Sequence, residues 1–368
     1  MSDASADTSG ATKRGSNSTD APKTETPRWM KWVTRISVAV GIAALIATVW
    51  LVGPHVIFHH LKNIGWFFIV IIGLELLSSV CDGTAVFYMA YGPGHPSWRD
   101  AVVAQIAGRG VNSVTPGGNL GEALKVGLLS RRCSTKRIIA AVMYVSLMIG
   151  VVSFVGVSLG SIATAFLFDV PRLGMVALFV GAGVAATAAV AIYLLLRRGM
   201  LTTMTGTLAR LHLISKKRRD NWNKTLGEVD RRLRGQDVEH RRHALVFIFI
   251  SQTIQKTLAF LVVYAAGYTL SPGQFLALVS AGVLLGWVST IIPMGLGILE
   301  GGNIALFTLI GAPPSLGLAL SLSRRVNQIV FAAIGFVVLT TDQVGSHVHG
   351  RMVVRKSAKM SRVADAHV

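Results

Sequence analysis

Six predominantly apolar runs, each long enough to cross a lipid bilayer as a helix, dominate the sequence. A helix rises about 1.5 Å per residue, so roughly twenty apolar residues span the hydrocarbon core while the backbone satisfies its own hydrogen bonds. The chain is 52% hydrophobic and only 14% charged. The runs cover residues 33–52, 65–91, 138–166, 173–196, 244–270 and 316–340. We therefore predict an all-α fold, a polytopic membrane helix bundle with about six full transmembrane helices.

Two further apolar stretches are interrupted by proline and glycine. The first, 101–129, is broken at Pro116, and the second, 274–311, is broken at Pro293. Proline deletes a helical hydrogen bond and clashes with the preceding turn, and neighbouring glycines weaken the helix further. Each stretch is therefore expected to form a broken hairpin of two short helices. Whether the hairpins are re-entrant or cross fully twice stays open at this point.

The net charge of +19 invites a comparison with nucleic-acid-binding proteins. The Lys and Arg residues, however, gather in the N-terminal segment, in loops 131–137 and 197–242 and in the C-terminal segment, with long apolar runs between them. That distribution is typical of the cytoplasmic face of a membrane protein. We predict no nucleic-acid partner, and a multi-pass protein of the plasma or inner membrane with both termini cytoplasmic.

These patterns divide the chain into three parts. Residues 1–32 are rich in Ser, Thr, Ala, Asp and Pro, which predicts a disordered basic cytoplasmic tail. Residues 33–340 form the transmembrane domain, which includes a basic cytoplasmic loop, 197–243. Acidic residues are interspersed among the bases of this loop, as in an amphipathic helix lying on anionic lipid. Residues 341–368 form a second basic cytoplasmic tail.

The two broken hairpins resemble each other. Glu122 follows Pro116 by six residues and Glu300 follows Pro293 by seven, each after a glycine-rich break. The predicted topology makes the crossings that flank the hairpins run in opposite directions, which is the pattern of inverted-topology repeats with a substrate site between them. Unwound backbone also exposes N–H groups that attract anions. The alternatives are a chance similarity and two ordinary packing kinks.

Several charged residues fall inside the apolar stretches. A charge at the centre of a bilayer helix costs roughly 2.5 to 3.5 kcal/mol on insertion scales, so such residues pair or face a cavity. Glu75 and Asp82 share one helix face, where a static ion pair is as good an explanation as function. A polar patch in the fifth run contains Gln252, Gln255 and Lys256. A functional role is favoured for the charges beside the breaks and for the adjacent arginines, namely Glu122, Lys125, Glu300, Arg324 and Arg325.

Arginine presents a planar fork that can bind a phosphate through two hydrogen bonds. An anionic lipid headgroup is therefore the expected substrate of these residues. We find no nucleotide-binding loop, serine nucleophile motif or zinc motif, and Cys81 and Cys133 lie outside any metal-ligand spacing. We predict no catalytic residues, no metal, no cofactor and no disulfide.

The segment 112–125, NSVTPGGNLGEALK, together with 292–301, IPMGLGILEG, resembles the lysylphosphatidylglycerol synthase transmembrane region, or flippase-like domain, family. The resemblance covers roughly 33–340 and implies movement of aminoacylated phospholipids or other lipid-linked molecules between leaflets. No soluble aminoacyltransferase domain is expected after 340, so the synthase reaction is not implied. The family motifs fall on Pro116, Gly117, Gly121, Glu122 and Lys125 in the first hairpin and on Gly297 and Glu300 in the second.

Three functions remain open. The first is a translocator of an anionic phospholipid or lipid-linked glycan. The second is a membrane-embedded accessory subunit that docks a cytoplasmic lipid-modifying or glycosyltransferase enzyme through 197–243. The third is an intramembrane transferase with Glu122 as general base, which makes enzymatic activity uncertain. The expected binding or translocation residues are Pro116, Gly117, Gly121, Glu122, Lys125, Pro293, Gly297, Glu300, Arg324 and Arg325.

Overall fold

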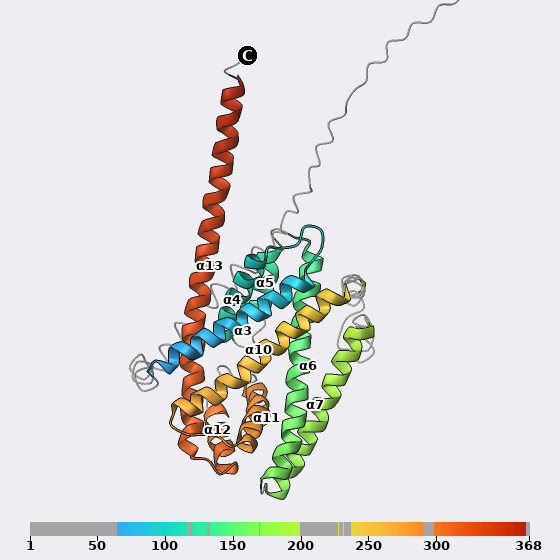
Figure 1. Ribbon diagram of the computed structural model, residues 1–368, viewed down its shortest axis with the longest axis vertical. Coiled ribbons are helices and arrows are strands. Elements are labelled where there is room, and N and C mark those ends of the chain that lie inside the picture. Colours follow the sequence, from blue (N-terminus) through green and yellow to red (C-terminus); the bar gives the residue numbers. More distant parts are fainter. Residues whose placement is uncertain are drawn as a thin grey trace, which may run out of the picture.

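The computed structural model describes residues 65–115, 120–130, 133–168, 170–198, 237–289 and 298–365, together with Gly227 and Arg231. Within these ranges the secondary structure is helical and contains no strand (Figure 1). The helices are α3 (Phe67–Met89), α4 (Trp98–Val114), α5 (Leu120–Leu129), α6 (Thr135–Leu167), α7 (Arg172–Arg198), α10 (Val238–Ala265), α11 (Pro272–Ser289), α12 (Ile298–Leu309) and α13 (Pro314–Asp365). The predicted all-α fold class is confirmed.

Five of these helices are long and apolar enough to cross a membrane, judged by length and composition. They are α3, α6, α7, α10 and the first part of α13, Pro314–Thr341. Each matches one of the predicted runs, and the remaining run, 33–52, lies outside the described residues. The helix α13 extends to Asp365, through most of the segment that we assigned to a C-terminal tail.

Side-chain N-caps determine where two of the helices begin. At α4 the Ser97 Oγ accepts from the Asp100 backbone N–H at 3.1 Å, and the Asp100 carboxylate accepts from the Ser97 N–H at 3.3 Å. This reciprocal capping box satisfies two backbone donors that a helix start leaves unpaired. The Asp237 side chain caps α10 by accepting from the Glu239 N–H. As a result α10 begins six residues before the apolar run that predicted it.

The two broken hairpins lie at opposite ends of the bundle. Figure 1 shows α4 and α5 at the end where α6 begins, whereas α11 and α12 lie at the end where α6 finishes. The helices stop at Val114 and Ser289 and resume at Leu120 and Ile298, on either side of the predicted breaks. The residues between, 116–119 and 290–297, lie outside the described ranges.

Helices from one half of the chain pack against helices from the other half. The helix α3 packs along α10, as Figure 1 also shows. The helix α6 of the first half packs against α11 of the second, and α13 of the second half packs against α4 of the first. Each hairpin is thus covered by a spanning helix from the other half. This reciprocity is what an inverted repeat produces, and it supports that interpretation.

Two glycines allow α4 and α13 to cross closely. A Cβ added at Gly110 would lie 2.8 Å from the Cα of Gly335, and the reverse is equally tight. That separation is shorter than carbon atoms tolerate, so a side chain at either position must push the two backbones apart. The approach of these helices brings the second half onto the first beside Arg109.

We expect Gly335→Ala to lower the melting temperature, because overpacking a close contact costs about 1–3 kcal/mol. The matched control is Gly183→Ala on α7, where an added Cβ has no neighbour within 4 Å. Both changes raise helix propensity equally, so the difference between the two melting temperatures reports the packing at Gly335. Thermal unfolding of the purified protein in one detergent measures it. Equal melting temperatures for the two variants would contradict the close crossing.

Candidate functional site

A cavity of about 580 Å³ opens between the two halves of the bundle. Its lining comes from α3, α4, α5 and α6 of the first half of the chain and from α10, α11 and α13 of the second half. A volume in the range of roughly 300–1,000 Å³ suits a small ligand or the headgroup of a larger one. The charged lining residues are Glu75, Asp82, Arg109, Glu122, Lys125, Lys256 and Arg324. So many charges among membrane-length helices make this cavity the candidate site.

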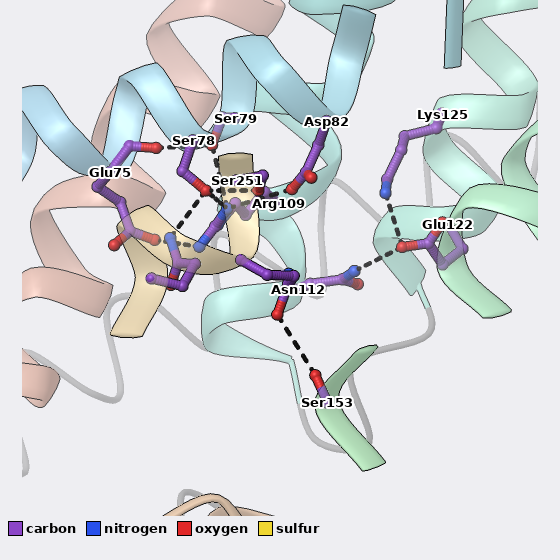
Figure 2. Close-up of polar contacts among 12 residues, drawn as sticks. Glu75, Ser78, Ser79, Asp82, Arg109, Asn112, Glu122, Lys125, Ser153 and Ser251 are labelled. Atoms are coloured by element: carbon purple, nitrogen blue, oxygen red, sulfur yellow. Dashed lines mark hydrogen bonds and ion pairs between the residues drawn. The ribbon is translucent and has the colours of Figure 1, made fainter. Parts of the chain in front are cut away.

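Arg109 of α4 connects both acids of α3. Its Nη2 lies 2.5 Å from Glu75 Oε1, and its Nη1 lies 3.6 Å from Asp82 Oδ2. Figure 2 shows Arg109 between these two acids. The same Nη1 donates hydrogen bonds to Ser78 Oγ at 3.3 Å and Ser79 Oγ at 3.4 Å. Glu75 and Asp82 are buried and lie two helical turns apart, so the guanidinium fork can reach both.

The polar face of α3 is also tied to the second half of the chain. Asn327 of α13 donates from Nδ2 to Glu75 Oε2 at 3.2 Å. Gln255 of α10 donates from Nε2 to Ser78 Oγ at 3.0 Å, and the Ser78 and Ser251 hydroxyls are 2.9 Å apart. Buried polar groups require such partners because an unpaired one costs several times the net value of a hydrogen bond. One network therefore spans both halves at the cavity wall.

Glu122 and Lys125 form an ion pair on α5, with Nζ 2.7 Å from Oε1. Asn112 and Ser146 also donate to the Glu122 carboxylate, at 3.4 Å and 3.3 Å. The side-chain Oδ1 of Asn112 in turn accepts a hydrogen bond from the Gly121 N–H at 2.6 Å. A Cβ at Gly121 would lie 1.9 Å from the Gly108 oxygen, so only glycine lets α5 approach α4 this closely. The first hairpin thus delivers its acid and its base to the cavity.

The second hairpin behaves differently. Glu300 of α12 forms an ion pair with Arg325 of α13, and neither residue lines the cavity. Arg324, the neighbour of Arg325, does line it. Its Nη2 lies 3.7 Å from where a Cβ on Gly282 of α11 would be. The structure therefore separates the two adjacent arginines, one at the cavity and one between helices.

Four of the residues expected at the site cannot be placed. Pro116 and Gly117 of the first break, and Pro293 and Gly297 of the second, lie outside the described residues. Most of the basic loop that we considered as a docking segment, 197–243, also lies outside them. Of the expected residues that are described, Glu122, Lys125 and Arg324 line the cavity and Gly121 packs against α4, whereas Glu300 and Arg325 pair elsewhere.

Sequence reasoning missed Arg109. Its signal was present, since it is the only charged residue between positions 101 and 121, where it lies between Gly108 and Gly110. Flanking glycines leave room for a long side chain and allow neighbouring helices to approach. In the part of the chain that the structure describes, no group of three or more His, Cys, Asp or Glu side chains is placed to hold a metal, and the two cysteines are buried and form no disulfide.

Part of the cavity wall is apolar. Phe68 and Ile71 near the start of α3 face the cavity together with Leu258 and Val262 towards the end of α10. Leu278 and Val283 of α11 and Leu320 of α13 add to this wall. A ligand that fits both parts of the lining has a charged or polar group joined to hydrocarbon.

Apolar helices of membrane-spanning length around a charged interior define a polytopic helical membrane protein. The family model described as lysylphosphatidylglycerol synthase TM region matches residues 34–335, and the chain belongs to this family. The resemblance that we inferred from the two glycine-rich motifs is therefore confirmed. No curated protein and no solved structure gives a significant match.

Proposed function

We propose that this protein moves a lipid with an anionic headgroup between the two leaflets of the membrane. The observation that carries the proposal is the cavity lined by helices of both hairpins, with four cationic side chains and an apolar part of its wall. The cations suit a phosphate-containing headgroup, and the apolar wall suits the start of its hydrocarbon chains. Membership of the family agrees with a lipid substrate but does not specify transport.

The arrangement of the hairpins supports alternating access. In inverted-repeat transporters the substrate site lies between the repeats, and rocking of one repeat against the other exposes it to each side in turn. Here the hydrogen bonds between α3 and the helices α10 and α13 cross the boundary between the halves. We place both termini and the basic loop 197–243 in the cytoplasm and the protein in the plasma or inner membrane, following the positive-inside rule.

The test is a leaflet-specific assay in proteoliposomes. Fluorescent phosphatidylglycerol is incorporated, and a membrane-impermeant reductant quenches the outer leaflet. Wild-type protein is expected to make the inner-leaflet fraction accessible. Glu122→Gln should slow this by roughly tenfold or more, because it removes a charge that binds Lys125 in the cavity. The matched control is Glu239→Gln, an exposed acid at the start of α10.

The outcomes separate transport from the docking alternative. Wild-type protein that leaves the lipid in its leaflet would overturn the proposal. If transport is instead normal in Glu122→Gln and depends on residues 202–226, the basic loop carries the function and the accessory-subunit hypothesis is favoured. We expect deletion of 202–226 to leave lipid movement by the purified protein unchanged, because the charged residues of the cavity lie on the helices.

A further inference from the structure

We infer that Lys256 and Arg324 form a phosphate subsite that selects a singly charged phosphodiester headgroup over a lipid diphosphate. The inference rests on the proposed function and narrows it, because phospholipids carry a phosphodiester whereas many lipid-linked glycans are carried on a diphosphate. Its basis is the uneven distribution of charge around the cavity.

The cations of the two halves have different surroundings. Arg109 and Lys125, from the first half, are each paired with carboxylates. Lys256 of α10 and Arg324 of α13 line the same cavity, yet no described carboxylate lies within 4 Å of either. Both are half-buried. Two neighbouring cations without an acid are costly in an apolar surrounding unless an anion joins them.

The total charge of the lining limits that anion. Four cations and three carboxylates line the cavity, which leaves one positive charge when all are ionised. A phosphodiester carries one negative charge and neutralises the lining. A diphosphate carries at least two, so its binding would leave at least one buried negative charge unpaired. Arg325 does not alter this balance, because Glu300 already pairs with it outside the lining.

The position of Arg324 favours a lipid over a soluble phosphate. A Cβ built on Gly282 would lie 3.7 Å from Arg324 Nη2 and 3.8 Å from Leu278 Cδ1. The guanidinium and the Leu278 side chain therefore both lie near one point of α11, and both residues line the cavity. A phosphate held there has hydrocarbon wall beside it, as the phosphate of a phospholipid requires.

Neutral polar groups line the cavity from the same two helices as the two cations. Gln252 and Gln255 lie on α10 with Lys256, and Asn327 and Gln328 follow Arg324 on α13. Amide side chains both donate and accept hydrogen bonds, so they suit the hydroxyl and ester oxygens of a headgroup without adding charge. The subsite thus offers two cations for the phosphate and amides for the groups attached to it.

The experiment measures binding to the purified, delipidated full-length protein in a mild detergent. Four probes are compared: dihexanoyl-phosphatidylglycerol, farnesyl diphosphate, sn-glycerol 3-phosphate and inorganic phosphate. We expect the short-chain phospholipid to bind at least roughly tenfold more tightly than the other three, since only it matches both the charge and the apolar wall. The comparison with farnesyl diphosphate tests the preference for a singly charged headgroup. The comparison with the two soluble phosphates tests the requirement for hydrocarbon chains.

Variants locate the site. Lys256→Gln and Arg324→Gln should each weaken phospholipid binding by roughly tenfold to a hundredfold, the value of a hydrogen-bonded charge. Lys256→Arg keeps the charge and should retain most of the affinity. The control Arg242→Gln removes an exposed cation from α10, the helix that carries Lys256, and should change nothing. Melting temperatures verify that each variant is folded.

Each result bears on the inference. The inference is overturned if the wild-type protein binds farnesyl diphosphate more tightly than the short-chain phospholipid. It is also overturned if the wild-type protein binds a soluble phosphate as tightly as that phospholipid. Unchanged phospholipid affinity in folded Lys256→Gln and Arg324→Gln would also overturn it. In either case normal lipid movement in proteoliposomes leaves the proposed function standing. Phospholipid binding as expected without any movement would instead refute the transport proposal and retain the subsite.

Discussion

Replacing Arg109 with glutamine is expected to destabilise the protein by about 3–5 kcal/mol, the usual cost of leaving buried charges without their partner. Glu75 and Asp82 both lose their cation, and their side chains are only 10% and 5% exposed. The hydrogen bonds from Arg109 to Ser78 and Ser79 are lost as well. Because this network joins α3 to α4 at the cavity, lipid movement should fall to the background rate.

The control for this change is Arg99→Gln, an exposed arginine on the same helix. Its melting temperature and transport should match the wild type. Arg109→Lys should be intermediate, because one ammonium group cannot reproduce a fork whose two nitrogens face two carboxylates. Thermal unfolding and the proteoliposome assay measure both properties. A folded, fully active Arg109→Gln protein would show that the two acids do not depend on this cation.

The helices and their breaks could be predicted because their signals are local. Twenty apolar residues specify a spanning helix through length alone, and a proline beside glycines specifies an interruption. The pairing of Glu122 with Lys125 was also accessible, since residues three apart share a helix face. The exact ends of the helices were harder to predict, because the capping residues Ser97 and Asp237 extend their helices into polar sequence.

The partner of Glu75 and Asp82 could not be predicted in the same way. Their shared face was evident, but the identity of the facing helix depends on how α3 packs against α4. The single arginine in the stretch 101–129 is a possible ion-pair partner. No local sequence pattern, however, relates it to acids some thirty residues earlier. Arg109 was therefore missed although its position among glycines marked it as unusual.

The separation of Arg324 from Arg325 follows from helix geometry. Successive residues of a helix point about 100° apart, so two adjacent arginines can face different neighbours. We grouped them because both are charged and close in sequence. In the structure Arg324 faces the cavity and Arg325 pairs with Glu300. Glu122 of the first hairpin therefore lines the cavity and Glu300 of the second does not, and a role of Glu300 in binding or translocation stays a prediction.

We expect the Glu300–Arg325 pair to show strong energetic coupling, measured by a double-mutant cycle with glutamine at each position. Either single change leaves one charge between α12 and α13 without its partner and should cost about 3–5 kcal/mol. The double change removes both charges and should be more stable than either single variant. A coupling energy of roughly 2–3 kcal/mol is therefore expected. Additive single effects would contradict the importance of this pair.

The Glu122–Lys125 pair provides the comparison for the same cycle. It lies within one helix, and the Glu122 side chain is 32% exposed compared with 23% for Glu300. Glu122 also keeps the hydrogen bonds from Asn112 and Ser146 when Lys125 is replaced. Its coupling should be smaller, about 0.5–1 kcal/mol. The difference has a structural reason: one pair joins two helices and holds the second hairpin against α13, whereas the other sits on α5 with its acid open to the cavity.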